Sequence, residues 1–296
     1  MIKFLKNLYN ETDFFFRRNI RLKRKYTGKN EPKENLFNDF SGEKRQTAEE
    51  KEKLYFEKYH LQEFKDNSTR RNYLENLAVI ELLENSLDLS PTLEACLNMI
   101  KILDIGSKNW FYASGEWSFF KYSLLRHCEQ SEAIHLLNNS DWIERSLRRS
   151  NHDNAIELDG IEIDAFRVYS DLHTRWDYAQ YYIKNLANSR YIAKDFLYHK
   201  EKYDYIIWFF PFVTEFPLQE WGLPLSKFKP VEMLRHAYDS LNPCGKILIV
   251  NQDEKEYAIQ EELIKNLNIS YEKKGDFKNS FLEFERKRCV TIVFKS

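Results

Sequence analysis

The sequence predicts an α/β protein: a doubly wound, mostly parallel seven-stranded sheet that ends in an antiparallel pair and follows a helical extension. From Lys101 onward, short apolar runs alternate with helical stretches. Such alternation is typical of a parallel sheet with helices on both faces. The last two apolar runs have no convincing helix between them, which predicts an antiparallel pair at the sheet edge. We therefore expect an N-terminal helical or irregular extension over residues 1–94 and a sheet domain over residues 95–296.

The expected strands are short runs of apolar and β-branched residues. They are Lys101–Ile105, Gly160–Ile163, Tyr191–Ala193, Tyr205–Phe209, Lys246–Val250, Ile269–Lys273 and Cys289–Phe294. Helices are expected between them where apolar residues recur with helical periodicity. These helices are Asp177–Leu186, Val231–Leu241 and Tyr257–Leu267.

The extension has less regular patterning. Residues 1–66 are polar, and we expect them to be irregular; residues 67–88 follow a capping sequence and are expected to be helical, with a short helix starting at Ser90. A basic stretch, Arg17–Lys25, follows three phenylalanines. Two interpretations stay open, a contact with RNA or another anionic surface and a solvated helix end.

Composition restricts the class of protein. Of 296 residues, 43% are hydrophobic, enough for a core, and the formal net charge of -1 gives no global field that attracts nucleic acid or membrane. No apolar run reaches the roughly 18 residues of a membrane span, and the amino end does not read as a secretion signal. The four cysteines show neither metal-ligand spacing nor a disulfide pattern. We expect a cytoplasmic protein without a membrane partner or a metal; the oligomeric state is not predicted.

The ends of the first two strands carry the strongest functional signal. The first ends in Asp104-Ile105-Gly106, and the second ends at Glu162, with Asp164 two residues later. A glycine lets the backbone approach a ligand, and a carboxylate at the next strand end accepts hydrogen bonds from ribose hydroxyls. This layout predicts a cofactor that contains adenosine.

The distance between these two motifs is unusual. Glu162 follows Gly106 by 56 positions, whereas the ribose acid ordinarily follows the glycine turn by about 20. The excess coincides with residues 123–157, whose composition resembles the translated product of bacterial palindromic repeats inserted in frame. We expect a surface insertion, which loops tolerate at little entropic cost; a functional lid is the alternative.

In order and spacing, apart from that insertion, the segments resemble the class I S-adenosylmethionine-dependent methyltransferases over about residues 95–296. The matching segments are Lys101–Gly106, Gly160–Glu162, Ala193–Phe196, Tyr203–Pro211 and Leu241–Val250. The loop of the family usually reads Asp-x-Gly-x-Gly-x-Gly, but here only Gly106 is a glycine. Because Asn tolerates the left-handed conformation, we expect Asn109 to replace one of the others.

The resemblance implies a Rossmann-like fold, S-adenosyl-L-methionine as the cofactor, and a set of binding residues. In the family's order, Asp104 orders the loop amides, Glu162 or its competitor Asp164 holds the ribose, and Asp195 faces the adenine amine unless it only caps a helix. Phe196 either flanks the base or packs in the core. The full expected cofactor site is Asp104, Gly106, Ser107, Asn109, Glu162, Asp164, Asp195, Phe196 and Phe209.

The methyl acceptor is less determined. The fourth strand ends in Phe209-Phe210-Pro211-Phe212, without the polar residue that holds the target nitrogen in amino-purine and amide methyltransferases. We expect an unidentified small molecule as acceptor. Two alternatives are a catalytically silent Rossmann-like binding protein and an RNA methyltransferase that uses the basic N-terminal stretch. No catalytic residue is predicted. Alignment of the acceptor, the methyl group and the sulfur accounts for most of the rate enhancement, and a base is needed only if the acceptor loses a proton.

We expect polar residues from two further segments of the chain to lie near the mouth of the pocket. These are Glu215 and Asn251–Glu254, and the segment Glu215–Pro224 has the Pro, Trp and Gly content either of a structured cap or of a packed connection.

Overall fold

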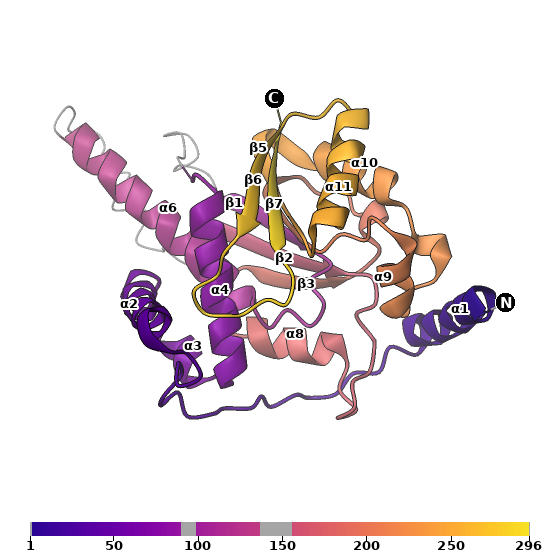
Figure 1. Ribbon diagram of the computed structural model, residues 1–296, viewed down its shortest axis with the longest axis horizontal. Coiled ribbons are helices and arrows are strands. Elements are labelled where there is room, and N and C mark those ends of the chain that lie inside the picture. The colour runs from indigo at the N-terminus through magenta and orange to yellow at the C-terminus, as the bar shows by residue number, and fades with distance from the viewer. Residues whose placement is uncertain (1, 90–98, 137–155, 296) are drawn as a thin grey trace.

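One sheet organises the molecule. The computed structural model describes residues 2–89, 99–136 and 156–295, and in these residues seven strands lie in the order β3-β2-β1-β4-β5-β7-β6 (Figure 1). The strands are β1 (Ile100–Ile105), β2 (Ile156–Glu162), β3 (Ser189–Ala193), β4 (Tyr203–Phe209), β5 (Leu241–Asn251), β6 (Tyr271–Phe277) and β7 (Arg288–Phe294). The pairs among β1 to β5 are parallel, and β7 runs antiparallel to both β5 and β6. The predicted fold class is confirmed.

Helices cover both faces of this sheet. Ile102, on one face of β1, belongs to the apolar core that also contains side chains of α4 (Arg70–Ser86), α6 (Ala113–Leu136) and α8 (Arg175–Ile183). Leu103, the next residue, belongs to a second core with α10 (Pro230–Asp239) and α11 (Glu254–Asn266). Alternate residues of a strand point to opposite faces. Because both faces are covered, the strands read in the sequence as continuous apolar runs.

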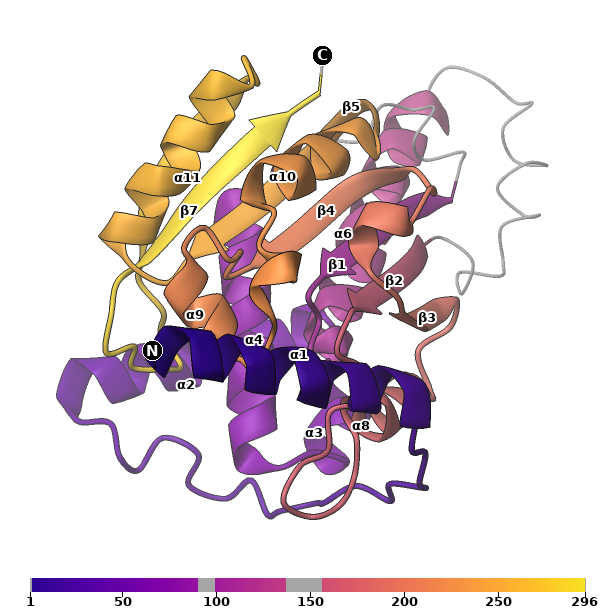
Figure 2. The same ribbon diagram turned by 90° about the vertical axis from the view of Figure 1, so that its right-hand side faces the viewer.

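The N-terminal extension is more regular than predicted. Its expected irregular part contains α1 (Ile2–Ile20), α2 (Gly42–Lys58) and α3 (Gln62–Asp66), so that prediction was wrong. The helix expected over 67–88 is confirmed as α4, with the Thr69 hydroxyl accepting a hydrogen bond from the Asn72 amide at 3.2 Å. In Figure 1 α1 lies on the opposite side of the molecule from α2, and a long extended segment joins the two helices (Figures 1 and 2).

The predicted surface insertion is narrower than 123–157. At one end Leu124 is buried and belongs to α6, which continues to Leu136 and projects from the body of the molecule (Figure 1). At the other end Ile156 is buried in β2 and pairs with Ile100. The rest, residues 137–155, lies outside the described residues, as do the short helix expected at Ser90 and the predicted domain boundary at 94.

Three short elements surround the carboxyl ends of the parallel strands. They are η2 (Phe196–Tyr198) after β3, and α9 (Glu215–Glu220) and η3 (Leu225–Lys227) after β4. The described part of the chain contains no helix that is both long and apolar enough to cross a lipid bilayer.

Candidate functional site

A cavity of about 320 Å³ opens at the carboxyl ends of β1, β2, β3 and β4. The register of the sheet explains why these ends meet, since Ile105 pairs with Ile161 on one side and with Trp208 on the other. Ligands of open parallel sheets bind at this edge. Five predicted site residues line the cavity, namely Gly106, Glu162, Asp195, Phe196 and Phe209.

The loop after β1 has the backbone of a glycine-rich loop with only one glycine. Its φ angles are positive at alternate residues: +74° at Gly106, +57° at Lys108 and +48° at Trp110. These are the three positions at which the resembled family places glycines. The expectation that Asn109 replaces a glycine was wrong, because Asn109 lies between the left-handed residues and is not one of them.

The side chain of Trp110 explains how this loop is held. Its indole is fully buried and covers Gly160 of β2, where an added Cβ would lie 2.7 Å from the ring. Its Nε1 donates a 3.0 Å hydrogen bond to Glu116 of α6. The indole therefore connects the loop to β2 and α6, and this packing and hydrogen bond offset the cost of a bulky residue at positive φ.

Two buried carboxyl groups lie beneath the loop. Asp104 and Glu116 are both fully buried, and the side chains of Tyr112 and Trp110 lie beside the Asp104 carboxyl group. Burial raises the pKa of Asp104 to about 8. Burial and the nearby Asp104 charge raise the pKa of Glu116 well above its usual value. Asp104, Ser107 and Asn109, also predicted site residues, do not line the cavity.

Glu162 occupies the position expected for the ribose acid. One carboxylate oxygen accepts a hydrogen bond from the Lys108 amide at 3.0 Å, and the other accepts one from the Asp164 amide at 2.7 Å. Arg175, at the start of α8, lies 3.3 Å from the second oxygen. Glu162 thus fixes the loop after β1 while its carboxylate faces the cavity.

Asp164, the competitor for that role, faces another partner. Arg17 of α1 binds its carboxylate with two hydrogen bonds, Nε to Oδ1 at 2.9 Å and Nη2 to Oδ2 at 3.2 Å. The same guanidinium donates to the carbonyl of Gly222 at 3.1 Å. Asp164 does not line the cavity, so the structure gives it a role in seating α1.

Asp195 follows β3, and it both caps a short helix and lines the cavity. Its Oδ1 accepts a hydrogen bond from the Leu197 amide at 3.2 Å, which caps η2. Its Oδ2 lies 3.0 Å from Nζ of Lys227. The residue lines the cavity beside Phe196, so a helix cap and a ligand contact are compatible here.

Several lining residues were missed in the sequence. The most important are Lys108, Arg175 and Trp221, whose ring lies 4.6 Å from Nζ of Lys108 and 5.5 Å from Cζ of Arg175. Burial, together with the Arg175 charge, lowers the pKa of Lys108. No carboxylate of the described residues lies within 4.0 Å of the Lys108 ammonium group. Lys194, Lys227 and Lys229 also line the cavity, which is therefore rich in positive charge.

The polar residues expected at the pocket mouth lie elsewhere. Glu215 forms an ion pair with Lys3 of α1, Asn251 is fully buried, and Asp253 caps α11. None of these three lines the cavity. The segment Glu215–Pro224 does form part of the wall, through Leu218, Trp221 and Leu223.

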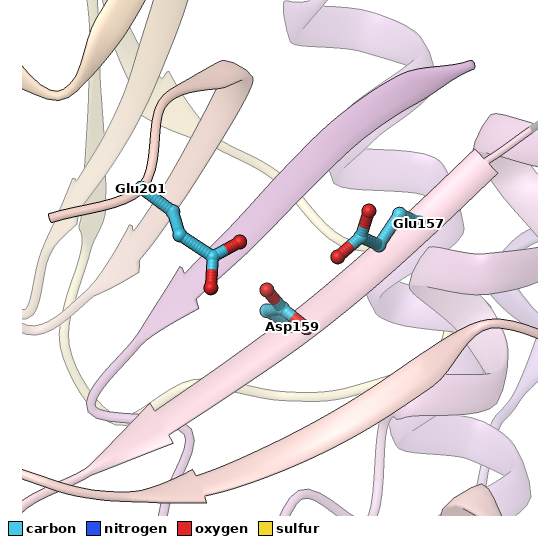
Figure 3. Close-up of side chains that lie close together, drawn as sticks. All are labelled: Glu157, Asp159 and Glu201. Carbon is cyan, nitrogen blue, oxygen red and sulfur yellow. The ribbon is translucent and has the colours of Figure 1, made fainter. Parts of the chain in front are cut away.

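A separate group of acids has the spacing of a metal site. Carboxylate oxygens of Glu157, Asp159 and Glu201 lie within 4.8 Å of one another (Figure 3). Arg190 of β3 is within 3.0 Å of all three, at 2.6, 2.5 and 3.0 Å respectively. Its guanidinium occupies the centre that a cation would need, so this group is an ion-pair cluster.

Only comparisons of structure find proteins similar to this chain. The sequence matches no protein-family model and no curated protein. Among solved structures it is similar to magnesium protoporphyrin IX methyltransferase from Synechocystis PCC 6803 with bound SAM, at 10% identity over 84% of this chain and 97% of that one (TM-score 0.41). It is also similar to TrmN from Thermus thermophilus, at 11% identity over 74% of this chain (TM-score 0.38), and spans 53% of that structure. The chain's own strand order, β3-β2-β1-β4-β5-β7-β6 with β7 antiparallel to both neighbours, is that of an open, mostly parallel α/β sheet.

Proposed function

We propose that the chain is an S-adenosylmethionine-dependent methyltransferase that acts on a small molecule. The observation that carries this proposal is the left-handed loop from Gly106 to Trp110, which borders the cavity, with the Glu162 carboxylate at the end of the next strand. The backbone geometry of a glycine loop is present although two of the glycines are not. The loss of those glycines therefore does not by itself argue for a silent binding protein.

The residues present fit such a cofactor. A Cβ added to Gly106 would meet nothing within 4 Å, so the cofactor can approach the backbone there. An ionised carboxylate has about four acceptor sites; two amides and Arg175 engage Glu162, which leaves room for a ribose hydroxyl. Phe196 and Phe209 supply apolar walls for a base. The cavity volume falls within the range of about 300–1,000 Å³ typical of small-molecule sites.

The protein's task in this reaction is positional. When bound, the cofactor supplies a methyl group already activated on a positively charged sulfur. The chain's residues then need to align the acceptor with that methyl group and exclude water. The segment Phe209–Val213 and the ring of Trp221 wall the cavity beyond the strand ends, which is where an acceptor would lie.

The side chains that line the cavity carry an excess of positive charge, which favours an acceptor with a negatively charged group. Lys108, Arg175, Lys194, Lys227 and Lys229 line the cavity against only two carboxylates, Glu162 and Asp195. Both carboxylates already pair with a cation. An acceptor with a carboxylate or phosphate group would complement the remaining positive charge. RNA is the second candidate, since Arg18 and Arg21 of the basic stretch line an adjoining cavity with Lys194.

Titration calorimetry with S-adenosylmethionine tests the cofactor. We expect the wild type to bind, and Glu162→Ala to lose roughly 1–3 kcal/mol of binding free energy, the usual cost of an unpaired polar group. Gly106→Val should abolish binding because its side chain would enter the cofactor's space. Glu262→Ala, at an exposed acid on α11, is the matched control and should bind like the wild type.

Two results would count against the proposal. A folded wild type that does not bind S-adenosylmethionine would favour the silent binding protein. Unchanged affinity in Glu162→Ala would place the cofactor elsewhere. If RNA is the acceptor, RNA binding should weaken steeply with salt because phosphate contacts release counterions.

A further inference from the structure

Helix α1 carries its apolar face on the outside of the molecule. Large apolar side chains that are 53–71% exposed follow one side of the helix: Phe4, Leu5, Leu8, Tyr9, Phe15, Phe16 and Ile20. At 3.6 residues per turn these positions share one broad face with Thr12 and Asn19, and no residue of that face is charged. Figure 2 shows α1 running across the outer surface with no other element in front of it.

The two polar residues of this face, Thr12 and Asn19, form hydrogen bonds with backbone carbonyls of their own helix. The Thr12 hydroxyl donates to the Leu8 carbonyl at 3.0 Å, and the Asn19 amide group donates to the Phe15 carbonyl at 2.7 Å. Polar groups bonded to their own helix lose little when water is removed. The whole outward face is thus suited to an apolar environment.

The inward face explains why the helix does not turn its apolar side to the protein. Asn10 donates to the carbonyls of Gln219 and Leu223, each at 3.1 Å, and Arg17 binds Asp164. Lys3 and Lys6 form ion pairs with Glu215 and Glu220 of α9. Directional polar contacts along the length of the helix therefore fix which face is exposed.

Positive charge adjoins the apolar face at the carboxyl end of α1. Between Asp13 and Glu31 the sequence contains no acidic residue. The exposed cations of residues 18–25 are Arg18, Arg21, Lys23, Arg24 and Lys25. Within the described part of the chain, no carboxylate lies within 4.0 Å of these five groups. Arg18 and Arg21 also line the adjoining cavity of about 260 Å³ together with Lys194 and with Asp195, whose carboxylate already pairs with Lys227.

We propose that α1 and residues 18–25 form a docking surface for an anionic lipid membrane, with α1 lying flat in the headgroup region. A helix with an uncharged aromatic and leucine face beside a run of Lys and Arg has the composition of an interfacial membrane helix. The membrane supplies both partners that this surface lacks, an apolar layer and a negative one. The cavity lined by Arg18, Arg21 and Lys194 offers a shaped seat for an anionic headgroup.

Charge complementarity favours a membrane over a second copy of the chain. Pairing two α1 faces would bury apolar area but would supply no acidic group for residues 18–25, because the exposed face of α1 has none. The same cations find abundant negative charge on anionic lipids, and this attraction acts over about a Debye length. The proposal depends only on binding and stands apart from the proposed methyl transfer.

Co-sedimentation of the full chain with vesicles tests the docking surface. We expect binding to phosphatidylcholine vesicles that contain phosphatidylserine and much weaker binding to phosphatidylcholine alone. Leu8→Glu and Phe16→Glu should each weaken binding by about tenfold or more, because each removes a large apolar side chain from the lipid contact. Arg21→Glu and Lys25→Glu should each weaken it at least about fivefold, with the effect reduced at high salt.

Matched controls come from α2, on the far side of the molecule. Leu54→Glu and Lys53→Glu alter exposed residues and should bind vesicles like the wild type. Unaltered melting temperatures would show that the α1 variants fold. Equal binding to both kinds of vesicle would overturn the anionic-lipid proposal, as would a lack of binding by a monomer. A dimer in analytical ultracentrifugation that Leu8→Glu abolishes would instead assign the surface to a second copy.

Discussion

At the scale of single residues, Lys108 is the most informative position. Its backbone is left-handed at φ +57°, and its amide donates to Glu162. A left-handed backbone costs a non-glycine residue roughly 1–2 kcal/mol. The loop therefore retains a strained residue whose side chain enters the cavity beside Trp221.

Comparing Lys108→Gly with Lys108→Ala isolates this strain. Both variants remove the ammonium group and its contact with Trp221, so they differ mainly in backbone freedom. We expect Lys108→Gly to be more stable than Lys108→Ala by about 1 kcal/mol, because alanine keeps the penalty at positive φ. Urea denaturation of both variants measures the difference. Equal stability, or a more stable alanine variant, would show that residue 108 is not left-handed in solution.

Only those site residues that directly follow a predicted strand could be predicted from the sequence. Gly106 and Glu162 follow directly from strand ends, and both line the cavity. The prediction for Asn109 was wrong because the left-handed positions follow the alternating spacing that Gly106 starts, and not the intrinsic tolerance of asparagine for that conformation. Arg175 enters the cavity from α8, far from Gly106 in the chain, and no local pattern marks it, whereas Trp221 belongs to the segment Glu215–Pro224 whose composition indicated a possible cap.

At the scale of elements, the contact between β1 and α6 buries two acids. Asp104 ends its strand beneath the loop, and Glu116 lies in the first turn of α6. Both have raised pKa values in the folded protein. Between the unfolded carboxyl pKa near 4 and about 8, the folded state therefore holds protons that the unfolded chain has released.

This difference predicts how stability changes with pH. The stabilising contribution is complete below the unfolded pKa, falls as the pH rises from about 4 because only the unfolded chain has released its proton, and is fully lost once the pH has passed through about 8. Asp104→Asn cannot ionise, so its free energy of unfolding should fall less steeply than that of the wild type over this range. Urea denaturation at a series of pH values measures both slopes. Parallel slopes would show that Asp104 is ionised throughout.

Some helices and strands have a hydrophobic pattern in the sequence that predicts them, and others do not. The parallel strands were predicted because burial on both faces gives continuous apolar runs. Helix α2 was missed because its described buried side chains include only Ala48 and Tyr55 among charged neighbours, which leaves almost no apolar stripe. Helix α1 was missed although its apolar residues recur at helical spacing; the spacing alone does not tell whether such a face points inward or outward.

At the scale of the whole molecule, net charge concealed an uneven distribution. A formal charge of -1 led us to expect no membrane partner, yet five exposed cations adjoin one uncharged helix face. The sum over a chain says nothing about where charge collects. The surface proposed for lipid is thus a property of arrangement, which composition does not record.

The segment between α6 and β2 offers a test of what the whole fold requires. Leu124 before this segment and Ile156 after it are both buried in the core. We expect replacement of residues 137–155 by a short Gly/Ser linker to leave the melting temperature and S-adenosylmethionine affinity nearly unchanged. Leu124→Ala is the contrasting variant and should cost about 2–5 kcal/mol, as for other buried leucines. Loss of cofactor binding in the linker variant would favour the lid interpretation.

The guanidinium of Arg17 joins the outer helix to the cavity. It binds Asp164 and the Gly222 carbonyl, while Arg175 lies 3.8 Å from Asp164 and 3.3 Å from Glu162. A chain of charges therefore runs from α1 to the acid that faces the cavity. Any coupling carried by this chain of charges would be reciprocal, because linkage between two binding sites acts equally in both directions. By whatever factor occupancy of the cavity changes the affinity of α1 for its surface, that surface changes the affinity of the cavity for its ligand.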